Sequence, residues 1–86
     1  MVKKLITVEL ASGLEARPAA MLVQVASQYE SAIYLEAEAK RVNAKSIMGV
    51  MMLAAGIGTE IEIETDGDGD AESMAALIAV LDGKNG

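Results

Sequence analysis

The sequence predicts an α+β domain in which three helices cover one face of a four-stranded antiparallel sheet. Apolar and polar residues alternate in three short segments, as they do in half-buried strands, and a fourth segment at Val42 follows one of them after a short connection. Apolar residues recur at helical spacing in the stretches between the strands. The predicted order is strand, helix, strand, strand, helix, strand, helix (βαββαβα). Packing every helix on the same side of the sheet buries all of the apolar faces, which gives an α+β sandwich.

The first and last predicted strands show the alternation most clearly. Residues Lys4–Leu10 place Ile6, Val8 and Leu10 on one face. In Glu60–Thr65, glutamate alternates with isoleucine. Both patterns are typical of strands with one buried and one solvated face.

The middle pair of strands is predicted to form a hairpin. Ala32–Ala37 forms the first strand, Val42 lies in the second, and the turn falls near Glu38 and Ala39. Tight hairpin turns favour Asn-Gly or Asp-Gly, and alanine tolerates positive φ much less well than glycine. We therefore expect either a wider loop or a mildly strained turn.

Three amphipathic helices are predicted between and after the strands. They span Ala16–Gln28, Ile47–Ala54 and Ala71–Leu81, with Pro18 near the start of the first and Asp70 as a plausible N-cap of the last. Glycines 56 and 58 end the second helix. The apolar stripe of the first helix consists of Ala19, Leu22, Val23 and Ala26, and that of the last consists of Met74, Leu77, Ile78 and Leu81.

The composition restricts the possible chemistry. The 86 residues form one domain, residues 1–86, and a chain of this size leaves little room for a deep substrate cavity. With no histidine and no cysteine, the chain lacks imidazole catalysis, disulfides and thiolate metal sites. We expect no enzymatic activity and no cofactor. The N-terminus shows no secretory signal, and the run Ile47–Ile57 is far shorter than the ~20 residues of a membrane helix, so we expect a soluble, cytoplasmic protein without membrane association.

Charge is distributed unevenly along the chain. The net charge is −6, and the acidic residues crowd the later part, whereas Arg17, Lys40, Arg41 and Lys45 lie in or near two motifs described below. An acidic protein is a poor direct ligand for nucleic acid, because phosphate contacts supply most of that affinity. We expect any effect on DNA to act through a partner protein.

The acidic run Asp66–Asp70 resembles the start of a calcium loop. Ala71 stands where that loop needs glycine, and Leu77 stands where it needs a bidentate glutamate. The run is therefore interpreted as a solvated turn, and no metal site is predicted.

The first motif is Gly13-Leu14-Glu15-Ala16-Arg17-Pro18-Ala19-Ala20. Arg17 beside the free N–H groups of a helix start is suited to holding an anion. A phosphorylatable side chain at position 15 would complete such a site, but a carboxylate, Glu15, is present. Glu15 either caps the helix electrostatically or imitates part of the charge of a phosphorylated residue.

The second motif spans Val42–Met51 and contains Ser46. A serine at a helix N-cap exposes its hydroxyl beside free N–H groups, and a phosphate placed there is stabilised. From the residues alone, a simple capping role is the favoured explanation of Ser46, because serine is a common N-cap.

The two motifs in register resemble those of the HPr family of the bacterial sugar phosphotransferase system over essentially the whole chain. The family motif Gly-(Ile/Leu)-His-Ala-Arg-Pro-Ala matches at every position except the histidine, which Glu15 replaces. The resemblance implies the family's open-faced sandwich, and it implies that the phosphoryl-accepting residue is lost. Among family members, this replacement is most similar to regulatory HPr-like proteins of bacilli, which keep the serine and have Gln in place of the histidine.

What the resemblance implies about function concerns Ser46. HPr kinase/phosphorylase would phosphorylate Ser46, and the product would act as corepressor of a LacI-family regulator of the CcpA type in carbon catabolite repression. Under this interpretation, transfer through position 15 is absent and signalling through Ser46 is intact.

A docking surface is expected around the second helix. A short helix cannot bury Ile47, Met48, Met51 and Met52 together, and exposed methionines suit adaptable contacts. Val50 and Leu53 are assigned to the core. The predicted docking residues are Ile47, Met48, Met51 and Ala20, with Glu15 at the anion site and Arg17 and Lys45 as flanking charges.

Two alternatives stay open at this point. One is a phosphocarrier with unusual chemistry at Glu15, such as an acyl phosphate. The other is an interaction module that acts without phosphorylation of Ser46. A monomer or a weak or strand-swapped homodimer is compatible with the alternating first strand and the atypical hairpin turn.

Overall fold

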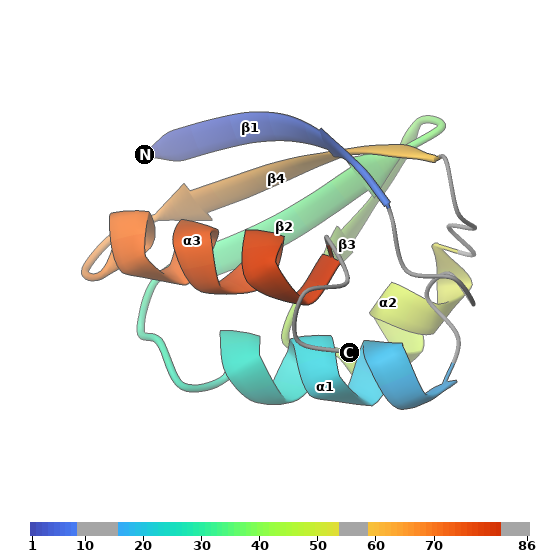
Figure 1. Ribbon diagram of the computed structural model, residues 1–86, viewed down its shortest axis with the longest axis horizontal. Coiled ribbons are helices and arrows are strands. Elements are labelled where there is room, and N and C mark those ends of the chain that lie inside the picture. The colour runs from blue at the N-terminus through green and yellow to red at the C-terminus, as the bar shows by residue number, and fades with distance from the viewer. Residues whose placement is uncertain (9–15, 54–58, 82–86) are drawn as a thin grey trace.

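The computed structural model describes residues 1–8, 16–53 and 59–81, the first residues of the first helix by their backbone. It confirms the predicted βαββαβα order and the open-faced sandwich (Figure 1). The elements are β1 (Val2–Thr7), α1 (Ala16–Ala26), β2 (Ala32–Ala37), β3 (Lys40–Asn43), α2 (Ile47–Met52), β4 (Glu60–Asp66) and α3 (Asp70–Leu81).

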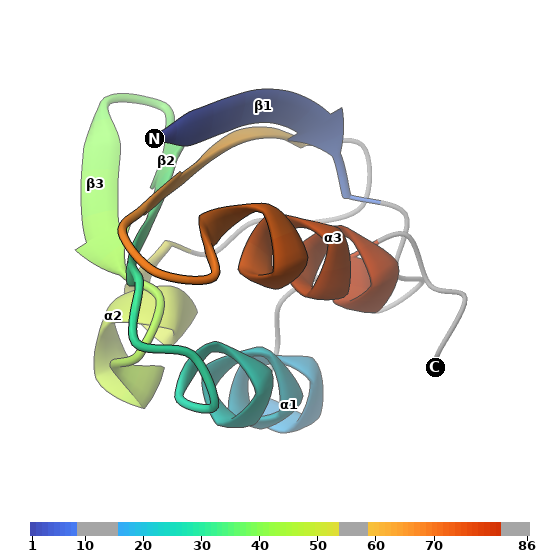
Figure 2. The same ribbon diagram turned by 90° about the vertical axis from the view of Figure 1, so that its left-hand side faces the viewer.

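The four strands form one antiparallel sheet in the order β1-β4-β2-β3. β4 pairs with β1 through six residue pairs from Val2↔Thr65 to Thr7↔Glu60, and with β2 from Ala32↔Asp66 to Glu36↔Glu62. Figures 1 and 2 show the three helices on one side of this sheet. The strands β1 and β3 are the two edges.

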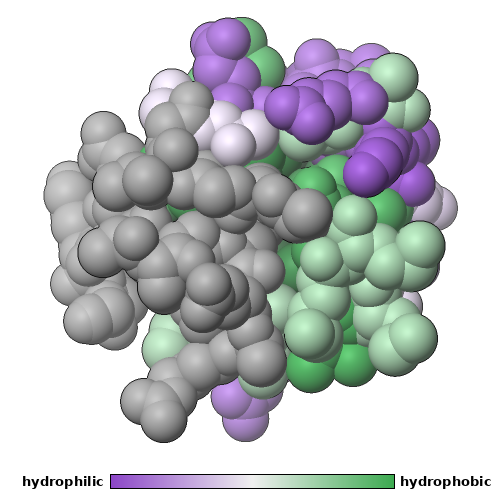
Figure 3. All heavy atoms as spheres, turned by 90° about the vertical axis from the view of Figure 1, so that its right-hand side faces the viewer, coloured by the Kyte–Doolittle hydropathy of each residue, from purple (hydrophilic) through white to green (hydrophobic). Residues whose placement is uncertain are grey.

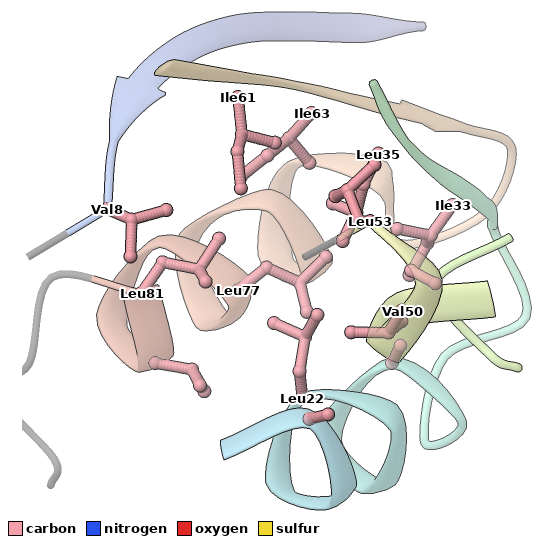
Figure 4. Close-up of a cluster of buried hydrophobic side chains, with 14 of the residues drawn as sticks. Val8, Leu22, Ile33, Leu35, Val50, Leu53, Ile61, Ile63, Leu77 and Leu81 are labelled. Atoms are coloured by element: carbon pink, nitrogen blue, oxygen red, sulfur yellow. The ribbon is translucent and has the colours of Figure 1, made fainter. Parts of the chain in front are cut away.

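The core lies between the sheet and the helices. Alternation turns Ile61 and Ile63 of β4 inward, where both are fully buried. The helices contribute Leu22, Val50 and Leu77, which point into the same cluster (Figure 4). The predicted stripes of α1 and α3 are thus the buried faces, with Val23 and Ile78 packed at the margin.

Some element boundaries differ from the predictions. β1 begins at Val2 and ends at Thr7, so it starts before the predicted Lys4, and α1 ends at Ala26 instead of Gln28. Val8 is buried and bonds through its N–H to the carbonyl of Thr59 (2.9 Å), as its predicted face requires. Leu10, Ala54 and glycines 56 and 58 lie outside the described residues.

The predicted cap at Asp70 is wrong. Asp70 is the first residue of α3, and the carbonyl of Gly69 accepts the first helical bond from the N–H of Ser73 (2.8 Å). The Asp70 carboxylate instead pairs with the amino group of Met1 (3.1 Å). Gly69 takes the cap position with a φ of 78°, a left-handed conformation that glycine adopts without steric cost.

The hairpin turn is tight and strained, and not the wider loop that was the other expectation. Ala37 pairs with Lys40, so only Glu38 and Ala39 connect β2 to β3. Both have positive φ, 51° and 68°. A two-residue turn of type I′ requires this backbone, which normally selects Asn and Gly. The sheet register therefore imposes an unfavourable conformation on two ordinary residues.

Buried hydroxyls join the sheet to α3. Ser31 and Ser73 share a hydrogen bond of 3.0 Å between their Oγ atoms, and Thr65 Oγ1 donates to the carbonyl of Asp70 (2.9 Å). All three side chains are buried. These bonds satisfy polar groups that would otherwise cost free energy in the core.

Within the described ranges, no helix has the length and hydropathy needed to cross a membrane.

Candidate functional site

A compact turn connects β3 to α2 and positions Ser46. The side-chain oxygen of Asn43 accepts a hydrogen bond from the N–H of Lys45 (2.8 Å), and its carbonyl accepts one from the N–H of Ser46 (3.0 Å). The N–H of Ala44 bonds back to Ile33 on β2 (2.9 Å), and Ala44 is fully buried. Asparagine favours such turns because its side chain replaces a backbone acceptor. The turn therefore holds Ser46 at a fixed place beside the sheet.

Ser46 is the N-cap of α2, as the sequence predicted. Its backbone is extended (φ −110°, ψ 114°), and its Oγ accepts a hydrogen bond from the N–H of Gly49 (3.2 Å). The carbonyl of Ser46 accepts the first helical bond from Val50 (3.0 Å). The residue is exposed, so its hydroxyl is accessible while it caps the helix.

Gly49 leaves room around this hydroxyl, a role that the sequence did not reveal. A Cβ placed on Gly49 would lie 3.5 Å from Ser46 Oγ and 3.4 Å from the Cβ of Val42. These distances are ordinary to tight van der Waals contacts. Because Gly49 has no side chain, one side of the Ser46 hydroxyl stays open. The backbone conformation at Gly49 does not itself require glycine.

Lys45 is engaged inside the molecule. Its Nζ donates a hydrogen bond of 2.7 Å to the carbonyl of Tyr29, just beyond the C-terminal end of α1, and the side chain is partly buried. A cation near the last carbonyls of a helix also interacts favourably with the helix dipole. The sequence predicted Lys45 as a flanking charge for docking; the structure adds a link between the Ser46 turn and the end of α1.

The outer side of α2 forms an exposed apolar surface, here called the α2 surface and made of Ile47, Met48, Met51 and Met52. Met48 and Met52 are 70% and 69% exposed, and Ile47 and Met51 are 43% and 44% exposed. Figure 3 shows hydrophobic side chains gathered on this side of the molecule. The assignment of Val50 and Leu53 to the core is confirmed, because they are 0% and 5% exposed.

The start of α1 lies on the same side of the molecule as α2 (Figure 1), and the two helices pack together. Arg17 falls in the first turn of α1, and Ala20 is exposed one turn further on. Met21 adds a partly exposed apolar side chain. Residues 16–20 of the first motif therefore lie on the same side of the domain as the second motif. Glu15 lies outside the described residues.

Charged groups on the opposite, open face of the sheet pair with each other. Arg41 on β3 contacts Glu64 on β4 (3.0 Å), and Lys3 on β1 contacts the same carboxylate (3.5 Å). The hydrogen bonds from Arg41 lower the pKa of Glu64, and the bond to Glu64 raises the pKa of Arg41.

Across the described ranges, no group of three or more acidic side chains is arranged to hold a metal ion.

The fold and the two motifs define a class: a small open-faced sandwich that places an N-capping serine beside an exposed apolar surface. The family model described as "PTS HPr component phosphorylation site" matches residues 2–82. The chain belongs to the HPr family. The resemblance stated from the sequence is thereby confirmed.

The relatives include proteins named HPr-like protein Crh and proteins named phosphocarrier protein HPr. The chain is 50% identical to the HPr-like protein Crh of Halalkalibacterium halodurans over 82 residues, covering 95% of this chain and 98% of that protein. It is 46% identical to Crh of Bacillus subtilis, covering 92% and 93%. It is 44% identical to the phosphocarrier protein HPr of Treponema pallidum, covering 98% and 96%.

Solved structures agree with the fold. HPr-C-His from Thermoanaerobacter tengcongensis superimposes with a TM-score of 0.92 at 40% identity, covering 98% of this chain and 94% of that one. The crystal structure of Bacillus subtilis Crh, described as a domain-swapped, intertwined dimer, has a TM-score of 0.75 at 44% identity, covering 94% and 93%.

Proposed function

We propose that this protein is a regulatory HPr-like protein that is phosphorylated on Ser46 by the ATP-dependent HPr kinase/phosphorylase of the cytoplasm. The phosphorylated form then binds a LacI-family regulator of the CcpA type as its corepressor in carbon catabolite repression. The observation that carries the proposal is the exposed Ser46 hydroxyl, which accepts a hydrogen bond from the Gly49 N–H and lies next to the α2 surface.

Phosphorylation at this place would change the surface without requiring a change of fold. A phosphate adds about −1.5 to −2 charge and strong acceptor oxygens for basic groups of a partner. Ser46 lies outside the core, so the added group need not displace buried side chains. The α2 surface supplies apolar area next to this charge, and the two together favour a partner with a basic rim around an apolar pocket.

Phosphotransfer through position 15 does not fit this chain. Glu15 stands where the family motif has its phosphoryl-accepting histidine, and the sequence contains no other histidine. An acyl phosphate on Glu15 is the chemical alternative. The test is incubation with labelled phosphoenolpyruvate, enzyme I and general phosphotransferase components. An acyl phosphate would label the wild type and would not label Glu15→Gln. We expect no label on either protein.

Phosphorylation is tested with purified HPr kinase/phosphorylase and ATP. We expect one phosphate on the wild type and on Ser27→Ala, which removes another exposed serine, and none on Ser46→Ala. The treated wild type should then bind a CcpA-type regulator more tightly than treated Ser46→Ala. Equal binding by these two proteins, or no modification of the wild type, would refute the proposal and favour a phosphorylation-independent interaction module.

A homodimer formed by strand exchange is a second candidate for assembly. In the monomer, β1 is an edge strand whose only sheet partner among the described strands is β4. Exchange of β1 between two copies would preserve the same pairing, and the solved Bacillus subtilis Crh gives a precedent. Light scattering after chromatography across a range of protein concentrations distinguishes a monomer from this dimer.

A further inference from the structure

Methionine is the only sulfur-containing residue in this chain, and its exposure varies widely from site to site. The sequence has six methionines and no cysteine. Met48 and Met52 are 70% and 69% exposed on the α2 surface, whereas Met74 in α3 is 2% exposed. An oxidant in solution therefore meets the thioethers of α2 directly, but reaches Met74 only when the core opens.

The arrangement on α2 concentrates this reactivity. Met48, Met51 and Met52 are spaced at i, i+3 and i+4, so their side chains lie together on one helix face. Val50 of the same helix is fully buried and packs in the hydrophobic core. Oxygen can thus be added to the methionines of the α2 surface without disturbing the contacts that hold α2 in place.

We propose that Met48 and Met52 are sites of reversible oxidation by two-electron oxygen donors of the peroxide class, which switches off docking at the α2 surface. The sulfur lone pair attacks the distal oxygen of hydrogen peroxide, the O–O bond breaks, and the products are the sulfoxide and water. The sulfur loses two electrons and the peroxide gains them. A sulfoxide reductase reverses the step with two thiols, giving the thioether, a disulfide and water.

The effect on docking follows from the change in polarity. A sulfoxide is polar and stiffer than a thioether, so it weakens apolar contact with a partner. Ser46 carries no sulfur, and its hydrogen bond to Gly49 does not involve the methionine side chains. This inference rests on the proposed function for its docking partner, but the oxidation itself is independent of phosphorylation.

The first measurement is the order of oxidation in the folded protein. Timed treatment with hydrogen peroxide, followed by peptide mass analysis, should show Met48, Met52 and the equally exposed Met1 reacting first. Met74 should react at least about tenfold more slowly than these three residues. Circular dichroism should show an unchanged fold after Met48 and Met52 have reacted. Comparable oxidation of Met74, or loss of the fold, would overturn the inference.

The second measurement separates this inference from the proposed function. Retention on a phenyl column reports the apolar α2 surface without any partner, and binding of Ser46-phosphorylated protein to a CcpA-type regulator reports docking. Oxidation should weaken both, and sulfoxide reductase should restore both. If the unoxidised phosphoprotein fails to bind the regulator, the proposed function fails, while the column still tests the change at the α2 surface.

The matched control replaces the reactive sulfurs and keeps the apolar surface. Met21→Leu, Met48→Leu, Met51→Leu and Met52→Leu together preserve side-chain size and hydrophobicity, and they replace every exposed methionine of α1 and α2 in the described part of the chain. Met1 in this variant still oxidises and lies at the other end of the sheet from α2 (Figure 1). Peroxide should leave its column retention and regulator binding unchanged. An equal loss in this variant and in the wild type would contradict the assignment to α2.

Discussion

Arg41 and Glu64 join strands that are not neighbours in the sheet. Arg41 belongs to edge strand β3 and Glu64 to β4, and their side chains meet at 3.0 Å across the intervening strand β2. The guanidinium group of Arg41 also lies 4.4 Å from the ring centroid of Tyr34 on β2. Because Lys3 of β1 contacts the same carboxylate, Glu64 connects both edges of the sheet on its open face.

This arrangement predicts a specific acid response. The hydrogen bonds from Arg41 lower the pKa of Glu64 below its ordinary value of 4.5. A lowered pKa in the folded state stabilises the fold above the ordinary value, and that stabilisation is lost as the pH falls below 4.5 through the folded-state pKa. Glu64→Gln should therefore show a smaller loss of stability than the wild type between about pH 6 and about pH 3, measured by urea unfolding. Arg41→Met removes the hydrogen-bond donor that lowers the pKa of Glu64 and should reduce the acid-dependent loss of stability in the same way.

The strained hairpin turn predicts a stabilising substitution. Ala39 has a φ of 68°, which glycine adopts without steric cost. Ala39→Gly should raise the free energy of unfolding by about 0.5–1 kcal/mol after the extra entropy of glycine in the unfolded chain is counted. Ala32→Gly in strand β2 should instead lower it. A urea midpoint for Ala39→Gly below that of the wild type would show that the turn is not strained.

Lys45 should contribute to stability as well as to the site. Lys45→Met removes the hydrogen bond to the Tyr29 carbonyl and should lower the free energy of unfolding by about 1 kcal/mol. Lys40→Met removes an exposed lysine of β3 and should have an effect within about 0.5 kcal/mol. Equal effects of the two substitutions in urea unfolding would argue against the role of Lys45 at the end of α1.

Gly49 should matter for modification more than for folding. The added methyl group of Gly49→Ala lies 3.5 Å from Ser46 Oγ, and alanine favours the helix. The melting temperature should stay the same or rise. Phosphorylation of Ser46 by the kinase should slow by about tenfold, because the added methyl group fills the open side of the hydroxyl where the phosphate donor must approach. Unaltered phosphorylation kinetics would show that the open side of the hydroxyl is not used.

The two sides of α2 should respond oppositely to truncation. Val50→Ala removes buried methyl groups and should cost about 2 kcal/mol of stability. Met52→Ala should change stability by less than about 0.5 kcal/mol, because the side chain is exposed. Under conditions in which both variants are folded, Met52→Ala should bind the regulator more weakly than Val50→Ala. Denaturant titration and binding at a temperature where Val50→Ala is folded provide the comparison.

Much of the fold was predictable because apolar residues alternate clearly in β4 and recur at helical spacing in α1, whereas β3 shows no such period. Ile61 and Ile63 point inward as their alternation requires, and Val50 and Leu53 are buried as assigned. Ser46 was predictable as a cap because serine and a following helical stretch carry a local signal.

The remaining features depend on contacts between distant segments. The bond from Lys45 to Tyr29 joins positions 16 residues apart, and its acceptor is a backbone carbonyl that has no sequence signature. The buried pair of Ser31 and Ser73 gives no signal either, because serine is usually exposed. The true start of α3 was missed because Gly69 and Asp70 both suit a cap, and the choice depends on backbone φ.

The separation of tasks within α2 has an evolutionary consequence. Val50 and the following Leu53 hold the helix against the core, while Met48 and Met52 contribute little to that packing. Mutations on the outer side can therefore accumulate without a loss of folding, and each one alters which partner surface fits. Under the proposed function, a lineage without phosphoryl transfer at position 15 would be free to change its binding partners through α2 while keeping the same scaffold.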